Sequence, residues 1–385
     1  MTSESPLRIA MVAGEESGDL LGVDLAESLR KITGRPVELS GVGGRHLREA
    51  GMDPLFDGSE IALMGITTVV KELPKLMRRI NQTAAHIVAS KPDCLITIDS
   101  PDFALRVAKK VREADPKIPI IHYVCPSVWA WRPGRAPSMK PYIDEILCVL
   151  PFEPEALRTL DGPQGTYVGH CLAANPGVAQ AAQMQTERIR EGRRTLLVLP
   201  GSRRSEVRRL LRPFGETVGI LAKRGHDFEV VVPTVPHVAQ IVRDGCLEWP
   251  VWPRFVESAE EKWQAFGEAD AALAASGTVL LELALSRVPM ISCYRPDWMA
   301  SQLMRFVTTW SAALPNLIAD WPVVPEFYND FVRPEYLARL IEQLWADTPA
   351  RIAQIDGLLH VARRMKMPKP PGDLAAEVVL RRIGR

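Results

Sequence analysis

The sequence predicts an α/β protein made of two domains, each built around a parallel sheet. Short apolar runs alternate with stretches of helical periodicity along the whole chain, which is typical of strands covered by helices. The pattern restarts after residue 194, and a length of 385 residues favours two hydrophobic cores over one.

The expected strands form two sets. The first comprises Leu7–Ala13, Glu38–Gly41, Cys94–Asp99, Ile120–Val124 and Glu145–Val149, and the second comprises Thr195–Leu199, Phe228–Val232, Ala271–Ala275 and Met290–Cys293. Apolar residues at helical spacing predict helices after the first strand (Leu21, Leu25, Leu29 and Ile32), over Glu206–Leu221 and over about Pro371–Ile383.

The domain boundary is expected near residue 173. The stretch from Ala173 to Arg194 is rich in Ala, Gln and charge and lacks a strand pattern, so we interpret it as a linker. The expected domains are therefore 1–172 and 173–350, followed by a helical segment 351–385 that crosses back to the first domain.

Composition excludes several classes of protein. A net charge of +1 gives no reason to expect nucleic-acid binding, and the first residues lack the basic and apolar regions of a secretory signal. No apolar run is long enough to span a bilayer, so we expect a cytoplasmic protein whose membrane contacts are peripheral. The six cysteines contain no Cys-x-x-Cys pair and are interpreted as mostly reduced core thiols.

Two neighbouring strand ends carry the most informative residues. One strand leads into Asp99-Ser100-Pro101-Asp102, and the other leads through Cys125-Pro126 into Trp129-Ala130-Trp131-Arg132. Carboxyl ends of parallel strands meet at one edge of a sheet, where α/β proteins bind ligands. From the residues alone, Asp99 is either a general base or a turn residue, and Asp102 caps the following helix or holds the loop.

Together with Ala13–Asp19, these segments resemble the lipid-A-disaccharide synthase family of bacterial glycosyltransferases, which join two acylated glucosamine units. The likeness continues through Val42-Gly43-Gly44, Leu63-Met64-Gly65-Ile66, Leu150-Pro151-Phe152-Glu153, Val168-Gly169-His170, Leu199-Pro200-Gly201-Ser202-Arg203, Ala275-Ser276-Gly277-Thr278 and Leu314-Pro315-Asn316-Leu317. Each motif is weak alone, but their order along nearly the whole chain is specific. Glu16, Cys171 and residues 308–313 depart from the family pattern.

The resemblance implies two Rossmann-like domains facing a cleft, which is the GT-B glycosyltransferase fold. It also implies an inverting transfer of 2,3-diacylglucosamine from UDP-2,3-diacylglucosamine to 2,3-diacylglucosamine 1-phosphate (lipid X), with Asp99 as the base. A UDP-sugar epimerase and a non-catalytic nucleotide-sugar sensor are the alternatives. The sequence has no Asp-x-Asp motif and no Gly-x-Gly-x-x-Gly fingerprint, so we expect neither a metal nor a cofactor. Whether the chain forms a homodimer stays open.

Substrate-binding residues are expected at two places in the first half. Glu15, Ser17 and Gly18 form the first strand-to-helix turn and either contact a sugar or cap the helix. Trp129, Trp131 and Arg132 either shape the mouth of the site or pack between the domains. His122 and His170 have no metal-pair spacing and no nucleophile to serve, so a structural role is favoured for both.

UDP-binding residues are expected in the second half, where two Gly turns follow strands and open helices. Backbone N–H groups of such turns bind diphosphates, and an arginine beside them can neutralise the charge; a solvated surface turn is the alternative. A carboxylate one turn into the second helix would accept hydrogen bonds from ribose. The candidates are Gly201, Ser202, Arg203, Ser276, Gly277, Thr278 and Glu282, with Asn316 added by the family motif.

A basic amphipathic helix is expected from Ile66 to Ile80. Because acylated substrates need an apolar landing surface, we assign membrane or acyl contacts to it, although packing on the core is the common alternative. The assigned residues are Val69, Leu73, Leu76, Lys71, Lys75 and Arg78. A second such candidate runs from Trp298 to Trp310.

Overall fold

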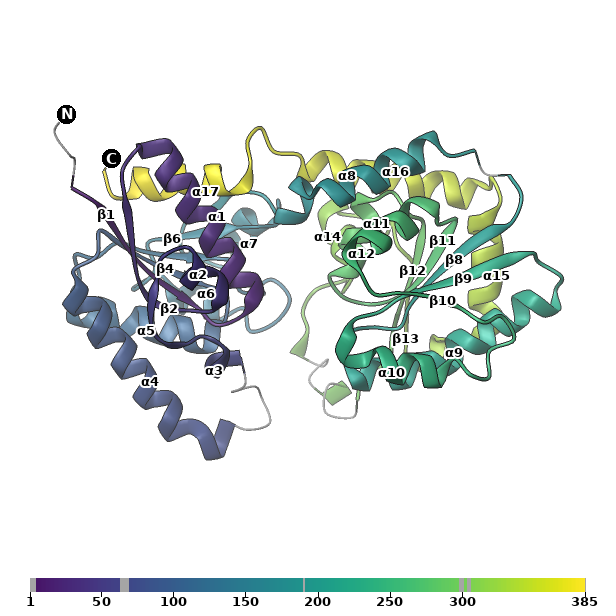
Figure 1. The fold of residues 1–385 in the computed structure, drawn as a ribbon, viewed down its shortest axis with the longest axis horizontal. Coiled ribbons are helices and arrows are strands. Elements are labelled where there is room, and N and C mark those ends of the chain that lie inside the picture. The colour runs from purple at the N-terminus through teal and green to yellow at the C-terminus, as the bar shows by residue number, and fades with distance from the viewer. Residues whose placement is uncertain (1–4, 63–68, 190, 298–300, 303–305, 385) are drawn as a thin grey trace. The chain divides into compact units, whose positions relative to one another are not determined.

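The computed structural model describes residues 5–62, 69–189, 191–297, 301–302 and 306–384. These residues form two compact units, each with its own sheet and its own hydrophobic core (Figure 1). The first unit contains the residues up to His170 and those from Met367 onward, and the second unit runs from Cys171 to Lys366.

The first unit holds a parallel sheet of seven strands in the order β3-β2-β1-β4-β5-β6-β7. The strands are β1 (Leu7–Ala13), β2 (Val37–Gly43), β3 (Asp53–Asp57), β4 (Cys94–Ile98), β5 (Ile120–Tyr123), β6 (Glu145–Cys148) and β7 (Gly165–Tyr167). The helices are α1 (Glu16–Thr33), α2 (Arg45–Glu49), α3 (Ser59–Ala62), α4 (Val69–Ser90), α5 (Pro101–Ala114), α6 (Arg135–Met139), α7 (Glu153–Thr159) and α17 (Pro371–Arg382).

The second unit holds a parallel sheet of six strands in the order β10-β9-β8-β11-β12-β13. The strands are β8 (Arg194–Leu199), β9 (Phe228–Pro233), β10 (Arg254–Val256), β11 (Ala271–Ala275), β12 (Met290–Tyr294) and β13 (Glu326–Tyr328). The helices are α8 (Pro176–Glu187), α9 (Arg204–Lys223), α10 (Pro236–Gly245), α11 (Ala259–Glu268), α12 (Val279–Leu285), α14 (Leu314–Ala319), α15 (Pro334–Trp345) and α16 (Pro349–Met365).

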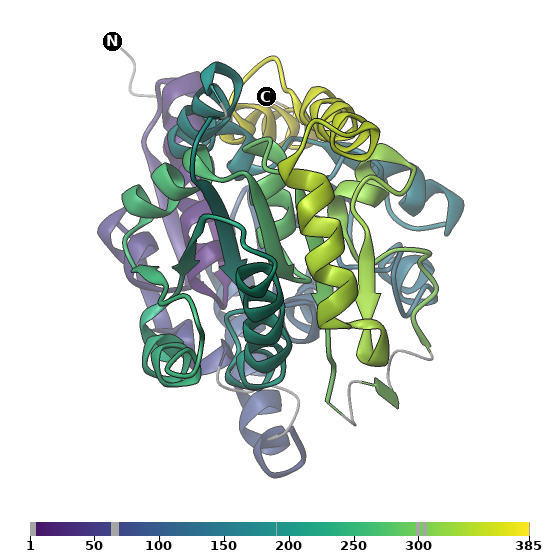
Figure 2. The same ribbon diagram turned by 90° about the vertical axis from the view of Figure 1, so that its right-hand side faces the viewer.

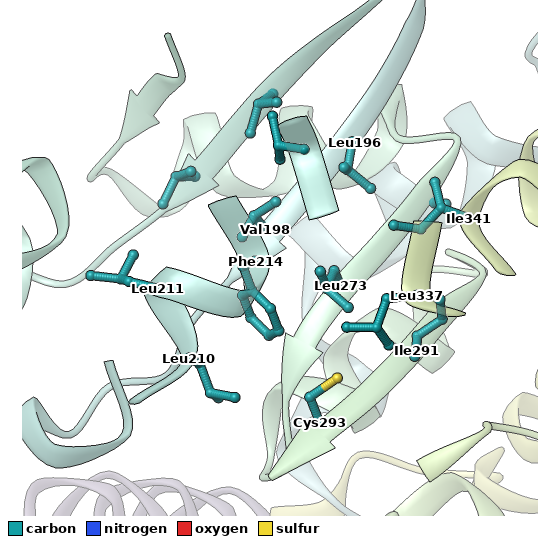
Figure 3. Close-up of a cluster of buried hydrophobic side chains, with 14 of the residues drawn as sticks. Leu196, Val198, Leu210, Leu211, Phe214, Leu273, Ile291, Cys293, Leu337 and Ile341 are labelled. Carbon is teal, nitrogen blue, oxygen red and sulfur yellow. The ribbon is translucent and has the colours of Figure 1, made fainter. Parts of the chain in front are cut away.

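Both sheets are buried on their two faces, as parallel sheets require. In the first unit α1, α2 and α17 pack on one face, and α4, α5 and α7 pack on the other. In the second unit α9, α10 and α15 cover one face, where Phe214 of α9 lies against Val198, Leu273 and neighbouring strand residues (Figures 2 and 3). These observations confirm the predicted α/β class with two parallel sheets.

The strand order places a topological switch point in each sheet. In the first unit the chain moves outward in both directions from β1 and β4, and in the second unit it does so from β8 and β11. The register pairs Val12 with Thr97 and Leu199 with Ala274, so the carboxyl ends of each central pair are level. Ligands of open α/β sheets bind at such points.

The segment Ala173–Arg194, which we predicted as a linker, is instead part of the second unit. Asn175 begins α8 by accepting hydrogen bonds from the N–H groups of Gly177 at 2.9 Å and Val178 at 3.3 Å. Ala181 is fully buried, and α8 packs along α11. An Ala-rich helix that buries small side chains carries little apolar signal, which is why the sequence misled us.

The chain returns to the first unit only from Met367 onward. Residues 351–366, which we grouped with the returning segment, belong mainly to α16 and pack within the second unit. Helix α17 lies on α1, and its Arg381 and Arg382 bind the buried Glu145 carboxylate at 3.0 and 3.2 Å. In the described part of the chain, no helix has the length and apolar character needed to cross a bilayer.

Candidate active site

A cavity of about 480 Å³ lies at the switch point of the second unit. It is bounded by the turns that follow β8 and β11, by the end of β9 and by the start of α11. Seven of the eight predicted UDP-binding residues line it: Gly201, Ser202, Arg203, Ser276, Gly277, Thr278 and Glu282. The structure therefore gathers two segments that are about 75 residues apart in the sequence around one cavity.

The two glycine turns leave backbone N–H groups available. Gly201 has a φ of 111°, and a Cβ there would approach Glu206 Oε2 to 2.8 Å, so only glycine fits without a shift. The residues that precede α9 and α12, Arg203 and Thr278, make no side-chain capping hydrogen bond. The first N–H groups of α9, a helix of 20 residues, are therefore available to an anion.

Two cations lie at this cavity, and sequence analysis found only one of them. Arg203 is exposed and pairs with Glu206 at 3.0 Å. Lys262 of α11 was missed. Its Nζ lies 3.2 Å from both oxygens of Glu282 and 4.1 Å from the centre of the Trp263 ring. No sequence motif identifies Lys262, because the surrounding residues have the composition of an ordinary charged helix. Lys262 lines the cavity only because α11 packs beside the two glycine turns.

Asn316 does not line this cavity. It is 1% exposed, and its amide is used within its own loop. The nitrogen donates to the Val324 carbonyl at 2.9 Å and to Glu326 at 3.1 Å, and the oxygen accepts from the N–H groups of Val323 and Val324 at 2.8 and 2.7 Å. The structure thus gives Asn316 an organising role for residues 311–326, and its direct contact with UDP stays a prediction.

The switch point of the first unit gathers the predicted acidic residues. Asp99 directly follows β4, is partly buried, and donates its N–H to the Tyr123 carbonyl at 3.0 Å. Burial raises the pKa of its carboxyl group, against a hydrogen bond from the Ser100 backbone. The turn after β1 lies beside it, since a Cβ on Gly14 would meet Ser100 Oγ at 2.8 Å.

Backbone strain concentrates at this edge. Among the described residues other than glycine, nine have a positive φ, and four of them are Asp99 (49°), Ser100 (43°), Val124 (74°) and Arg132 (54°). Such conformations cost about 1–3 kcal/mol each and tend to cluster where function requires a fixed geometry. They hold the ends of β4 and β5, where the sequence predicted the site.

In the turn after β1, two of the predicted residues are exposed to solvent and the third is buried. Glu15 and Ser17 are exposed at the start of α1, and Glu15 precedes the helix without a side-chain capping bond. Gly18 is buried, and a Cβ there would press on Ile98 Cγ2 at 3.3 Å, so this glycine allows α1 to pack on β4. Asp19 does not cap α1 but accepts N–H bonds from Gly44 and His46, both at 2.7 Å.

Trp129 and Trp131 are held by different contacts. Trp129 donates its indole N–H to Glu153 at 3.3 Å and packs edge-on against Phe152 with 5.0 Å between ring centres. Trp131 is covered by the Arg132 guanidinium, 4.1 Å from its ring centre. The buried Glu153 thus holds Trp129 by an interaction that sequence analysis did not anticipate.

Of the two predicted structural histidines, His122 is fully buried and His170 is partly buried. His122 Nδ1 lies 2.8 Å from Thr97 Oγ1, and burial lowers the pKa of His122 to about 3. Burial also lowers the pKa of His170 to about 4. Neither ring is poised to exchange protons near neutral pH.

Part of the α4 surface that we predicted to contact lipid packs instead against the first unit. Leu76 packs against the hydrophobic core of the first unit, and Lys75 lies 3.7 Å from Glu60. Arg78 is exposed. The side chains of Val69, Lys71 and Leu73 lie outside the described residues, as do Leu63–Ile66 and much of the second candidate; at its end, Trp310 is 56% exposed.

Comparison with known proteins shows that the chain matches one protein family over nearly its whole length. A family model described as lipid-A-disaccharide synthetase matches residues 9–366. A lipid-A-disaccharide synthase of Rhodopseudomonas palustris is 44% identical over 98% of this chain and 97% of its own. One from Bradyrhizobium diazoefficiens is 43% identical over 99% of this chain and 98% of its own.

Solved structures show the fold. The chain is similar to Acinetobacter baumannii MurG, with a TM-score of 0.60 at 12% identity, covering 98% of this chain and 100% of the other. A UDP-glucosyltransferase from Polygonum tinctorium gives 0.61 at 12% identity and covers both chains fully. A UDP-GlcNAc 2-epimerase from Methanocaldococcus jannaschii gives 0.57 at 13% identity, covering 97% and 98%. The predicted GT-B fold is confirmed, and likeness of fold alone does not separate transferases from epimerases.

Proposed function

The chain belongs to the lipid-A-disaccharide synthase family and is a glycosyltransferase of lipid A biosynthesis, and from this premise we propose which residues do the work. The donor is UDP-2,3-diacylglucosamine, the acceptor is 2,3-diacylglucosamine 1-phosphate, and the products are the disaccharide 1-phosphate and UDP. The family match over nearly the whole chain supports this activity over that of an epimerase.

The UDP group is assigned to the cavity of the second unit. The observation that carries this assignment is the pair of glycine turns at the switch point, with Lys262 beside them. Backbone N–H groups at Gly201 and at the start of α9 would bind the diphosphate, while Arg203 and Lys262 would supply positive charge. Glu282 would accept hydrogen bonds from the ribose.

Asp99 is assigned the role of general base. The acceptor 6-hydroxyl oxygen attacks the anomeric carbon from the face opposite UDP, forming the new C–O bond while the bond to the phosphate oxygen breaks. Asp99 takes the hydroxyl proton, and UDP leaves with the bonding electron pair. The donor-side N–H groups and cations stabilise the charge that develops on the leaving diphosphate.

Replacing Lys262 with Ala is expected to weaken UDP binding by about 10- to 100-fold, the effect of losing a charge-assisted hydrogen bond. The loss also leaves the Glu282 carboxylate, now unpaired, to repel the diphosphate. Isothermal titration calorimetry with UDP measures the effect. Lys262→Arg keeps the charge and should retain binding within a few fold, whereas an unchanged Kd for Lys262→Ala would remove Lys262 from the donor site.

We propose that the enzyme is a peripheral protein at the cytoplasmic face of the bacterial inner membrane, because its proposed substrates are acylated. The start of α4 is the proposed contact, and the residues assigned to it are Val69, Lys71, Leu73, Lys75 and Arg78. Basic residues near an anionic surface contribute about 1 kcal/mol each. A homodimer stays a prediction, which analytical ultracentrifugation in detergent tests.

Removing the α4 charges should loosen membrane binding. The triple change Lys71→Gln, Lys75→Gln and Arg78→Gln is expected to lower affinity for anionic vesicles at least tenfold, measured by cosedimentation. Arg79 is left in place because it binds Glu60 at 2.9 Å and therefore supports the fold.

A matched control removes three exposed charges from the second unit: Arg208→Gln, Arg212→Gln and Lys223→Gln on α9. If both triple variants sediment like the parent, the α4 contact is wrong. If both lose binding equally, the effect reflects total charge and not a surface on α4.

A further inference from the structure

We propose that Cys125, Cys148 and Glu153 form a binding site for a thiophilic divalent cation such as Zn²⁺ in the first unit. Their donor atoms, two sulfurs and a carboxylate oxygen, all lie within 4.8 Å of one another. The three residues are 4%, 0% and 2% exposed, so the cluster is part of the interior. This site is separate from the proposed chemistry and does not depend on it.

The fold brings the three residues together at one sheet edge. Cys125 lies two residues beyond β5, Cys148 ends β6, and the two strands run side by side with Tyr123 opposite Leu147. Glu153 begins α7 and reaches back to the same edge, where its Oε2 accepts the N–H groups of Val149 and Leu150, both at 2.9 Å.

The donors fit a soft metal. Thiolates bind Zn²⁺ at about 2.3 Å and carboxylates at about 2.0–2.2 Å, so donors around one ion lie about 3.3–3.8 Å apart. The Cys125 thiol donates to the Pro126 carbonyl at 3.3 Å and the Cys148 thiol to the Ile146 carbonyl at 3.7 Å, so both sulfurs keep lone pairs for a metal. Glu153 Oε1 accepts a hydrogen bond from the Trp129 indole and keeps a second lone pair for a metal. Three protein ligands leave the fourth tetrahedral position to water, and sulfur ligands disfavour Mg²⁺ and Ca²⁺.

The charge of Glu153 supports the same conclusion. Within the described residues, no Lys, Arg or His lies within ion-pair distance of this carboxylate, although it is almost completely buried. Buried carboxylates are normally paired with a cation or bound to a metal. A divalent ion would supply the missing positive charge. It would also tie the ends of β5 and β6 to α7 and fix the segment that carries Trp129.

Cobalt titration tests the site directly. The full chain, stripped of metal by a chelator and held in a phosphine reductant, is titrated with Co²⁺. We expect one equivalent per chain to produce a near-ultraviolet thiolate charge-transfer band with tetrahedral visible bands, and Zn²⁺ to displace both. Added Zn²⁺ should raise the Tm of the parent, whereas Mg²⁺ should not.

Cobalt binding by cysteine variants distinguishes this site from the other thiols of the chain. Cys125→Ala and Cys148→Ala should each weaken cobalt binding at least tenfold, and Glu153→Gln about tenfold. Cys94→Ala is the matched control, because Cys94 is a fully buried thiol on the opposite face of the same sheet and should bind as the parent does.

The parent protein alone can overturn the proposal, whatever the stability of the variants. Absence of the charge-transfer band at micromolar Co²⁺, together with less than about 0.1 equivalent of bound Zn²⁺ by mass spectrometry of the metal, excludes the site. Bands that persist unchanged in Cys125→Ala and Cys148→Ala assign the metal elsewhere and exclude it as well.

Discussion

Replacing Asp99 with Asn is expected to lower kcat by about 10²- to 10⁴-fold, the range for loss of a general base, while raising the Tm. The carboxyl pKa of Asp99 is raised by burial, so the charged form is disfavoured in the folded protein. Its contribution to stability is full below the unfolded pKa and is lost as the pH rises through the folded pKa. At neutral pH the fold therefore holds an unfavourable charge, which Asn removes.

Asn also suits the backbone at this position. Asp99 has a φ of 49°, and Asn tolerates the left-handed region better than other residues with a side chain. Asp99→Ala would confound the measurement with added strain. Asp102→Asn is the matched control, because Asp102 lies three residues further on, in the first turn of α5, but is exposed and pairs with Arg135 at 2.7 Å. Initial rates and calorimetry should show a slow, more stable Asp99→Asn enzyme and a near-normal control.

The Asp99 carboxyl group is also expected to determine how kcat/KM falls at low pH. Since the base must be ionised, kcat/KM of the parent should rise as the pH rises through the pKa of Asp99, which burial raises. An Asp99→Asn enzyme that transfers sugar at the parent rate, or that loses stability, would contradict the assignment of this residue as a buried base.

Replacing Asp270 with Ala is expected to destabilise the second unit by about 3–5 kcal/mol, the cost of breaking a buried ion pair. Asp270 is completely buried, binds Arg188 at 2.9 Å and Arg194 at 3.5 Å, and accepts the Thr195 N–H at 2.8 Å. Its loss removes an anion that binds two guanidinium groups at the start of β8 and β11.

Calorimetry distinguishes this effect from surface electrostatics. The transition of the second unit is identified by its upward shift with UDP, and Asp270→Ala should lower it. Asp227→Ala is the control, because Asp227 is 83% exposed beside Arg193 at 3.3 Å, and such pairs contribute about 0–1 kcal/mol. A shift no larger than that of the control would show that Asp270 does not organise the unit.

The interior of the fold was predictable because buried parallel strands are continuous apolar runs. The structure has β1 over Leu7–Ala13 and β11 over Ala271–Ala275, as predicted. The edge strands β3, β7, β10 and β13 were missed. They have three to five residues and are only partly buried, so their composition carries no apolar run.

The candidate site was predictable where it depends on strand ends and not where it depends on packing. Gly201 and Gly277 indicate turns by their residue type. They follow β8 and β11, which are neighbours in the sheet, so both turns line one cavity. Lys262 carries no local signal, because it meets Glu282 only through the packing of α11 beside α12. Glu153 lies in a family motif, but its contact with Trp129 joins residues 24 positions apart and could not be predicted locally. Asn316 was selected by its motif alone, and the motif gave no sign that its amide would bind the backbone of Val323 and Val324.

The most direct test of the proposed transfer measures UDP release by the purified chain with UDP-2,3-diacylglucosamine in detergent, with and without 2,3-diacylglucosamine 1-phosphate. Release that requires the acceptor, with the disaccharide 1-phosphate identified by mass spectrometry, is the predicted result. Equal release with and without acceptor, or tight UDP binding with no release, would contradict transfer between these two substrates.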